Sequence, residues 1–283
     1  MKYKKIVIIG TGLIGGSIGK ALLEKGLAEE VIGVCRRQSS LDRALKEKAV
    51  SSGFVNSYEE ALPGAEIIFI ATPVHTIKEV FEKMAGAVTA GTIVTDVGSS
   101  KKEIVEFARR FKDKFSFVGG HPLAGSEKTG VESSNADLFE DSVCILTPTA
   151  ETRGEDVKKL KELWESIGAT VGIISPEKHD ENLAFSSHLP HAVAYALAGA
   201  RDKEIPKEMF ATGFKDTTRI ASSDAMLWSD IFVSNRDNVL KAIERFKKAL
   251  SEIESAIKGN KEEDLKKLLE NYKALRDELF EKG

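Results

Sequence analysis

The chain has 283 residues, of which 42% are hydrophobic and 30% charged, values that are ordinary for a soluble globular protein. Its 41 basic and 44 acidic residues give a net charge of −3, which favours neither nucleic acid nor an anionic membrane as a partner. No apolar run approaches the roughly 20 residues that a membrane-spanning helix needs, and no signal peptide is recognisable. The two cysteines, Cys35 and Cys144, lie in apolar strand-like runs. We expect both to be reduced core thiols, which fits a cytoplasmic protein.

Residues 1–174 alternate between short β-rich runs and helical patterns. Seven runs are expected to be strands, at residues 6–9, 31–35, 66–71, 92–96, 115–118, 143–147 and 170–174. Their apolarity is continuous, which is typical of strands buried on both faces of a parallel sheet. The alternation predicts an α/β fold with an N-terminal Rossmann-type, doubly wound sheet.

Residues 175–283 carry no further strand signal and are expected to form an all-helical domain. Residues 190–201 are rich in alanine and apolar on most sides, which predicts a buried helix. Near the end of the chain, apolar residues recur every three or four positions on both sides of a break at Gly259-Asn260. This spacing predicts an antiparallel helical hairpin with a long apolar seam. The seam serves packing within the chain, and we expect it also to form a homodimer through these C-terminal helices.

The first expected strand leads into a glycine-rich turn that opens a helix. Its six residues are Gly10, Thr11, Gly12, Leu13, Ile14 and Gly15. In this context the G-x-G-x-x-G pattern is the dinucleotide-binding fingerprint, so we expect all six residues to bind a nucleotide cofactor. Gly10 permits the tight turn, Gly12 lets the backbone approach the pyrophosphate, and Gly15 lets the helix pack on the strand. The helix N-terminus adds N–H groups and a positive dipole.

Two further turns at the ends of expected strands belong to the same prediction. Ligands of open α/β sheets bind at the carboxyl ends of the strands, where Thr72, Pro73 and Asp96 are expected. His75 either borders the cofactor or is a partly exposed loop residue.

The end of the second expected strand bears on which cofactor is bound. A carboxylate there would bind the ribose hydroxyl of NAD, whereas an arginine accommodates the 2′-phosphate of NADP. The chain has Arg36 and Arg37 followed by Gln38 and two serines, and no carboxylate before Asp42. This pattern slightly favours NADP over NAD, unless both arginines are simply solvated.

The segment Gly119–Gly130 combines four glycines and a proline with several polar side chains. This composition predicts a shaped loop rather than a helix or strand. His121 lies within it, and histidine is the side chain best suited to move a proton near neutral pH.

Five motifs occur in order along the chain. They are Gly10 to Ser17, Asp96-x-x-Ser99-x-Lys101, His121 to Glu127, Ser187 to His191, and Gly213 to Arg219. Together they resemble the prephenate/arogenate dehydrogenase family of tyrosine biosynthesis, over nearly the whole chain. The resemblance implies an NAD(P)-dependent oxidative decarboxylation of prephenate to 4-hydroxyphenylpyruvate. Arogenate is the alternative substrate, and an enzyme that accepts both is a third possibility.

The resemblance also implies roles for individual residues. His121 would be the base on the 4-hydroxyl group, which suits an imidazole within hydrogen-bond reach. Ser99 resembles the serine that orients this histidine, and Ser100 is a close alternative. Arg219 would clamp a substrate carboxylate with its planar guanidinium, unless it pairs with Asp216 instead.

Two histidines and several neighbouring residues complete the expected substrate site. His188 and His191 lie three positions apart near Pro190, which can place both on one helix face. A metal site is not expected there, because no cysteine or carboxylate ligands accompany them at zinc spacing. The resemblance places His191 in the substrate pocket, with His188 either supporting it or structural. The other residues that the resemblance places near the substrate are Ser126, Glu127, Gly213 and Trp228.

Some of these residues have a second interpretation. Glu127 can instead pair with Lys128, and Trp228 can simply pack in the core. His179 is expected at the surface or between the domains.

Two other functions remain open at this point. A β-hydroxyacid dehydrogenase also combines a Rossmann half with a helical half, but it relies on a catalytic lysine in the helical domain. The polar cluster here is centred on histidine, which argues against that enzyme. A non-catalytic, NADP-sensing protein would bind the cofactor without turnover.

Overall fold

The computed structural model describes residues 2–125 and 128–280. It divides into two compact units, Met1–Asn235 and Arg236–Gly283. The division predicted from the sequence, 1–174 and 175–283, follows the end of the strand signal instead. That division into domains stays a prediction.

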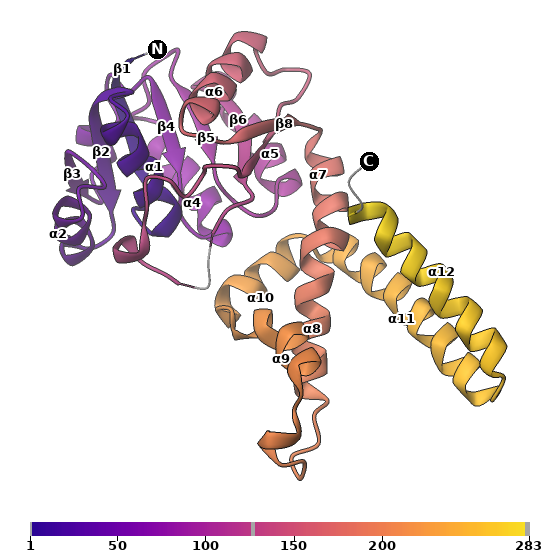
Figure 1. The fold of residues 1–283 in the computed structure, drawn as a ribbon. Helices are drawn as coiled ribbons and strands as arrows, with labels where there is room; N and C mark the ends of the chain where they lie inside the picture. Colours follow the sequence, from indigo (N-terminus) through magenta and orange to yellow (C-terminus); the bar gives the residue numbers. More distant parts are fainter. Residues whose placement is uncertain (1, 126–127, 281–283) are drawn as a thin grey trace. The chain divides into compact units, whose positions relative to one another are not determined.

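The first unit contains one eight-stranded sheet in the described residues, with the order β3-β2-β1-β4-β5-β6-β7-β8 (Figure 1). The strands are β1 (Tyr3–Ile9), β2 (Ala28–Cys35), β3 (Ser52–Val55), β4 (Ile67–Ile70), β5 (Ile93–Asp96), β6 (Ser116–Pro122), β7 (Val143–Thr147) and β8 (Thr170–Ile173). All neighbours pair in parallel except β6 and β7, which pair antiparallel. The predicted Rossmann-type fold is confirmed. Strand β3 was missed because its sequence, Ser52-Gly53-Phe54-Val55, holds an apolar run of only two residues.

Helices cover both faces of this sheet, so successive residues of a strand enter different cores. The helices are α1 (Leu13–Glu24), α2 (Gln38–Lys46), α3 (Tyr58–Ala61), α4 (Val74–Met84), α5 (Lys102–Ala108) and α6 (Gly154–Ser166). Ile6 and Ile8 of β1 pack in the core that includes buried residues of α1, α2 and α6. Val7 and Ile9 pack in the opposite core with α3, α4 and α5. Burial on both faces explains the continuous apolar runs.

The prediction of a loop from Gly119 onward is wrong for its first four residues. Gly119 to Pro122 belong to β6 and pair antiparallel with β7. A Cβ atom at Gly119 would lie 2.4 Å from the Thr147 hydroxyl, and one at Gly120 would lie 2.8 Å from the Asp96 carbonyl oxygen. These glycines therefore allow close packing inside the sheet, where the composition had indicated a turn.

The first unit continues into helices α7 (Pro176–Leu183), α8 (Leu189–Gly199), α9 (Thr212–Thr218) and α10 (Ala225–Ser234). Ser175 is the N-cap residue of α7, and its hydroxyl accepts a hydrogen bond from the backbone N–H of Lys178. A π-helical turn, Ala184–His188, joins α7 to α8. The prediction that α8 is buried is wrong for this chain, since Leu197 on it is 38% exposed and most of its alanines are not buried. Alanine supplied much of the apolar signal, and a partly exposed methyl group costs little.

The second unit is the predicted hairpin, formed by α11 (Arg236–Lys258) and α12 (Glu262–Phe280). Asn260 in the connecting turn has a positive φ of 49°, a conformation that asparagine tolerates better than most residues. Tyr272 on α12 donates a hydrogen bond of 2.6 Å to Glu252 on α11. The hairpin carries large exposed apolar side chains, among them Leu250, Leu275 and Leu279.

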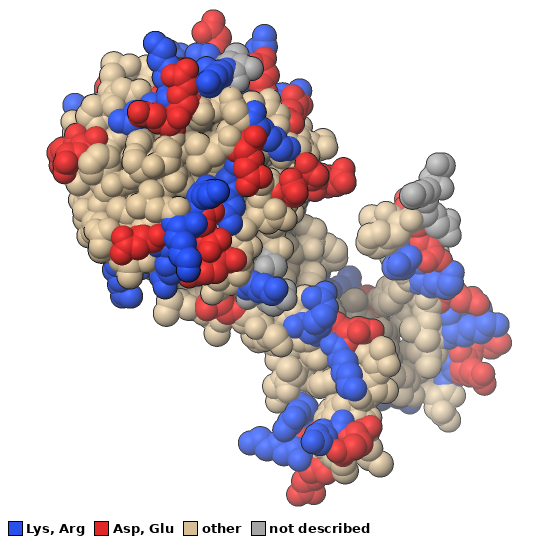
Figure 2. Space-filling view, turned by 60° about the vertical axis from the view of Figure 1, so that its left-hand side comes forward, with Lys and Arg blue, Asp and Glu red and all other residues tan. Residues whose placement is uncertain are grey.

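The surface carries charges of both signs. Figure 2 shows basic and acidic side chains interspersed on the face drawn, in line with the small net charge. Among the described helices, none has the length and apolarity that crossing a membrane requires. Cys35 and Cys144 are both buried free thiols.

Candidate functional site

The glycine-rich turn between β1 and α1 has the shape that a dinucleotide needs. Gly10 has a φ of +94°, and a Cβ atom there would lie 2.6 Å from the carbonyl oxygen of Ala71. A Cβ atom at Gly15 would lie 2.0 Å from the carbonyl oxygen of Gly10. At Gly12, by contrast, a Cβ atom would meet nothing within 4 Å. Two glycines are thus required by the fold, while Gly12 borders open space at the start of α1, where a pyrophosphate can approach the backbone.

The remaining residues of the turn lie around this space. Thr11 is buried and its hydroxyl is 3.1 Å from the Cys35 thiol at the end of β2. Leu13 and Ile14 are half-buried in the first turn of α1. Arg36 and Arg37 are exposed directly after β2, so both lie at the same edge of the sheet as the glycine turn.

The turn after β4 packs against the glycine turn. The Thr72 methyl group would lie 2.9 Å from a Cβ atom at Gly10. The Thr72 hydroxyl is buried and has no hydrogen-bond partner within the described part of the chain. A buried hydroxyl in this position fits a polar group that a bound cofactor would supply. Pro73 follows and is the N-cap residue of α4.

Asp96 at the end of β5 has an internal set of partners. Its carboxylate accepts hydrogen bonds from the N–H groups of Gly98 (2.8 Å) and Gly120 (3.2 Å) and pairs with the Lys101 ammonium. Lys101 also donates to the Gly120 carbonyl oxygen at 2.9 Å. Both side chains are fully buried, and burial lowers the pKa of Lys101 although Asp96 opposes the shift. The predicted cofactor contact of Asp96 would therefore have to come from its backbone, while its carboxylate anchors the strand that carries His121.

His121 forms a hydrogen-bonded chain with two residues of α7. Its Nδ1 lies 2.8 Å from His179 Nε2, and His179 Nδ1 lies 2.8 Å from an Asp180 carboxylate oxygen. A carboxylate accepts, so His179 Nδ1 carries the proton and His179 Nε2 accepts from His121 Nδ1–H. This order leaves the lone pair of a neutral His121 on Nε2. A histidine held in that tautomer can act as a general base.

Of the two positions predicted for His179, the surface is wrong, while the position between the predicted domains 1–174 and 175–283 stays a prediction. Its side chain is fully buried, and it is the hydrogen-bonded neighbour of His121 although 58 positions separate them. The His179-Asp180 dipeptide in a Ser175-capped helix was the one signal that could have drawn attention to it.

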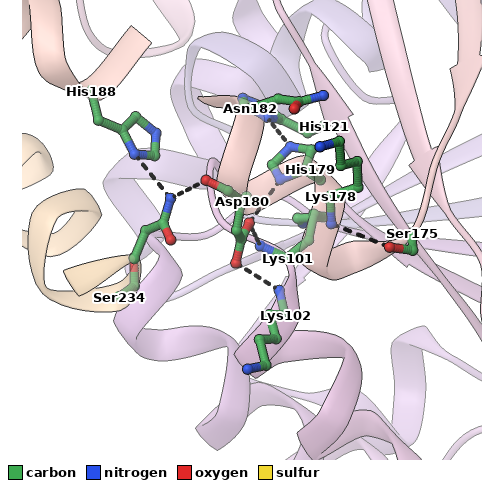
Figure 3. A network of polar contacts seen from close by, with 12 residues as sticks. Lys101, Lys102, His121, Ser175, Lys178, His179, Asp180, Asn182, His188 and Ser234 are labelled. Carbon is green, nitrogen blue, oxygen red and sulfur yellow. Dashed lines mark hydrogen bonds and ion pairs between the residues drawn. The ribbon is translucent and has the colours of Figure 1, made fainter. Parts of the chain in front are cut away.

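Asp180 also fastens α7 to the start of α5. Its two carboxylate oxygens accept from the backbone N–H groups of Lys101 (2.7 Å) and Lys102 (2.9 Å). Figure 3 shows Asp180 between His179 and this pair of residues. A carboxylate satisfies the first N–H groups of a helix well, because they have no partner within the helix. The same carboxylate therefore holds His179 in place and orients its ring.

The electrostatic surroundings keep these imidazoles neutral. Burial is the largest cause that lowers the pKa of His121 well below 6.5, and His179, Lys101 and His188 lower it further. Burial also lowers the pKa of His179, although Asp180 opposes the shift. Near pH 7 both rings are therefore neutral, which is the state that the hydrogen-bond order requires.

The structure gives neither candidate serine a hydrogen bond to His121 among the residues it describes. Ser99 is half-buried, whereas Ser100 is buried with its hydroxyl unpaired within residues 2–125 and 128–280. Ser100 is thus the serine whose hydrogen-bonding capacity is left for a ligand.

The structure brings His188, His191 and Trp228 together. The His191 ring stacks on Trp228, with centroids 3.4 Å apart and 19° between the planes. His191 Nδ1 donates to the Ser187 carbonyl oxygen at 3.1 Å. Trp228 also meets the edge of His188, with centroids 6.1 Å apart. The tryptophan therefore supports the histidine predicted in the substrate pocket as well as packing in the core.

His188 links this group to the His121 chain. It is 1% exposed, and burial lowers its pKa to about 4. The Asn235 amide lies 3.3 Å from His188 Nδ1 and donates to the Asp180 carbonyl oxygen at 2.7 Å. His188 is thus a buried neutral support between the two clusters.

Other predicted residues are not brought into these clusters. Gly213 lies in α9 and Arg219 in the turn that follows it, and both are exposed. Among the described residues, no hydrogen bond or ion pair joins Gly213 or Arg219 to His121 or His191. In the same part of the chain, Arg219 makes no ion pair with Asp216. Ser126 and Glu127 lie outside the described residues. The described residues hold no group of three or more histidine, cysteine or acidic side chains placed to bind a metal ion.

Comparisons with known protein families and sequences agree on one family. Residues 18–173 match the nucleotide-binding domain of prephenate dehydrogenase, and residues 175–271 match its dimerization domain. Prephenate dehydrogenase of Bacillus subtilis is 34% identical over 279 residues, which cover 96% of this chain and 74% of that protein. Cyclohexadienyl dehydrogenase of Zymomonas mobilis is 32% identical over 279 residues, covering 96% and 93% respectively.

A solved structure agrees with these matches. Prephenate dehydrogenase of Aquifex aeolicus, crystallised with hydroxyphenyl propionate and NAD+, superimposes with a TM-score of 0.90 at 36% identity, covering 99% of both chains. The resemblance found in the five motifs is therefore confirmed. The match to both domains and the extent of the identity show that this chain belongs to the prephenate dehydrogenase family of oxidoreductases.

Proposed function

We propose that this chain catalyses the oxidative decarboxylation of prephenate to 4-hydroxyphenylpyruvate with a nicotinamide dinucleotide. The hydrogen-bonded chain His121–His179–Asp180 carries the proposal, because it fixes a neutral imidazole with an open Nε2. The relatives described above support the same reaction. When bound, the cofactor supplies the acceptor for the hydride that leaves C4 of the substrate.

His121 takes the proton in this reaction. Its Nε2 removes the proton of the 4-hydroxyl group while C4 loses its hydride and the ring carboxylate leaves as CO2, and the proton then returns to the phenolate oxygen that aromatisation leaves. The imidazolium that forms donates through Nδ1 to His179, which in turn donates to the Asp180 carboxylate. Such charge-assisted hydrogen bonds stabilise the charged form of the base as it develops.

The substrate's anionic groups are assigned to the helices after β8. We assign the side chain of the substrate to His191, supported by Trp228 and His188, and a carboxylate to Arg219. Ser126, Glu127 and Gly213 complete the proposed substrate site. One of the two serines of the Asp96-x-x-Ser99 turn, Ser99 or Ser100, contacts the reacting groups.

NADP is proposed as the slightly preferred cofactor. Arg36 and Arg37 at the end of β2 support this preference, because guanidinium groups suit a 2′-phosphate. The exposed apolar side chains of the α11–α12 hairpin support a homodimer, as does the match to a dimerization domain. The two buried free thiols support a cytoplasmic location.

The test is a kinetic comparison of prephenate and arogenate, each with NAD+ and NADP+. We expect turnover of prephenate, with a higher kcat/KM for NADP+ than for NAD+. The variant His121→Asn should keep its cofactor affinity and lose about 10²- to 10⁴-fold in kcat, the usual contribution of a general base. A preference for arogenate would reassign the substrate, and cofactor binding without turnover of either substrate would refute an enzymatic role.

A further inference from the structure

One carboxylate connects the cofactor side of the site to the substrate side. Asp230 on α10 accepts two hydrogen bonds from His75 in the first turn of α4, although 155 positions separate the two residues. The backbone N–H of His75 lies 3.0 Å from Asp230 Oδ2, and His75 Nδ1 lies 2.9 Å from the same oxygen. Since a carboxylate only accepts, His75 Nδ1 carries a proton in this contact.

The contact replaces a local helix cap. Pro73, the N-cap residue of α4, provides no side-chain hydrogen bond to the first turn. The Asp230 carboxylate on α10 supplies such a hydrogen bond instead. It lies at the N-terminus of α4, where the helix dipole favours a negative charge. The Asp230 side chain is only 13% exposed, so water competes little for it, whereas the His75 side chain is 54% exposed. The bond is therefore a specific junction between α4 and α10.

Each end of this junction reaches one half of the site. On one side, the α4 start follows Thr72, which packs against Gly10 of the glycine turn and carries a buried unpaired hydroxyl in the described structure. On the other side, Trp228 lies on α10 two residues before Asp230 and stacks on His191. The His75–Asp230 junction therefore joins the segment that contains Thr72 to the helix that carries Trp228.

We propose that Asp230 is a positioning residue that couples cofactor binding to substrate binding through His75. The inference rests on the proposed function. A bound cofactor orders the turn at Thr72, the junction then holds α10, and Trp228 is held against His191 in the arrangement that binds the substrate's side chain. Because coupling between two sites is reciprocal, substrate binding raises cofactor affinity by the same factor.

The test measures this factor by calorimetry with the full chain. The probe is 4-hydroxyphenylpyruvate, titrated with and without saturating oxidised cofactor, so that no turnover occurs. The coupling factor is the ratio of the two Kd values, and we expect at least about fivefold in the wild type. Asp230→Ala removes both hydrogen bonds and should reduce the factor to near 1. His75→Ala keeps the backbone bond and should leave an intermediate factor. In both variants, the affinity for the cofactor measured without the probe should differ from that of the wild type by less than about twofold.

A matched control comes from another polar contact of α4, made with Glu103 on α5. Glu103→Gln breaks the ion pair with Lys78 on α4, at exposed positions, and should leave the coupling factor unchanged. A purely structural role would weaken probe binding equally with and without cofactor, and that result would overturn the inference. So would wild-type coupling in Asp230→Ala, or no coupling in the wild type. If Asp230→Ala does not fold, the coupling factor of His75→Ala tests the inference, because the largely exposed His75 side chain can be removed without loss of the fold. A wild type that neither binds the probe nor turns over would instead refute the proposed function itself.

Discussion

His179→Leu tests whether His179 orients and stabilises the proposed base. The change removes the ring nitrogen that accepts from His121 Nδ1–H at 2.8 Å. Asp180 keeps both of its backbone donors at the start of α5, so the junction between α7 and α5 is preserved. We expect a fall in kcat with little change in cofactor affinity, because the glycine turn is untouched.

The size of the fall follows from the charge that develops on His121. Once the ring is an imidazolium, its hydrogen bond to His179 is charge-assisted and contributes about 1.5–3 kcal/mol. Since about 1.4 kcal/mol corresponds to a factor of ten, kcat should fall about 10- to 150-fold. Loss of the fixed tautomer acts in the same direction.

The matched variant is His179→Gln. Its amide oxygen can reach the position of His179 Nε2 and accept the same hydrogen bond, so we expect it to recover part of the lost kcat. Steady-state formation of reduced cofactor gives kcat and KM, and thermal unfolding verifies the fold of both variants. A wild-type kcat in His179→Leu would refute the role of His179. An equal fall in kcat in the two variants would show that a hydrogen-bond acceptor for His121 Nδ1–H does not account for the effect of His179.

Three further predictions follow from the same structure. Because burial and neighbouring groups lower the pKa of His121 well below 6.5, the acid limb of kcat/KM against pH should have its midpoint below that value; a midpoint above it would contradict the assignment of the base. His188 has a folded-state pKa of about 4 against about 6.5 unfolded, so the unfolded chain takes up the proton first as pH falls. Between pH 8 and pH 4 the free energy of unfolding of the wild type should therefore fall by about 3 kcal/mol more than that of His188→Gln. Urea unfolding of both proteins at each pH measures this difference, and equal falls in the two proteins would exclude it. Gly12→Ala should keep the wild-type melting temperature and lose cofactor affinity, because its Cβ atom would enter open space, whereas Gly15→Ala should lose both. An unchanged melting temperature in Gly15→Ala would show that the turn adjusts.

The sequence by itself determined the features that depend on neighbouring residues. A strand is followed directly by the six-residue motif from Gly10 to Gly15, within which the helix begins, so this pattern predicts the cofactor turn without knowledge of the fold. The spacing of apolar residues likewise predicts the hairpin of α11 and α12, because side chains three and four positions apart share a helix face. The five motifs together pointed to the family, and the one that contains His121 pointed to the residue proposed as the base.

Only the tertiary structure decided which distant residues act together. Strand pairing made Gly119 to Pro122 part of β6, and packing of α7 on α5 brought His179 to His121. Strand pairing also placed the Gly120 N–H against the Asp96 carboxylate, while the predicted cofactor contact of Asp96 stays a prediction. Periodicity reports burial and local conformation, but hydrogen bonds between segments depend on the order of strands and the packing of helices. For that reason the sequence pointed to His121 as the base, while the fold supplied the neighbours that orient it.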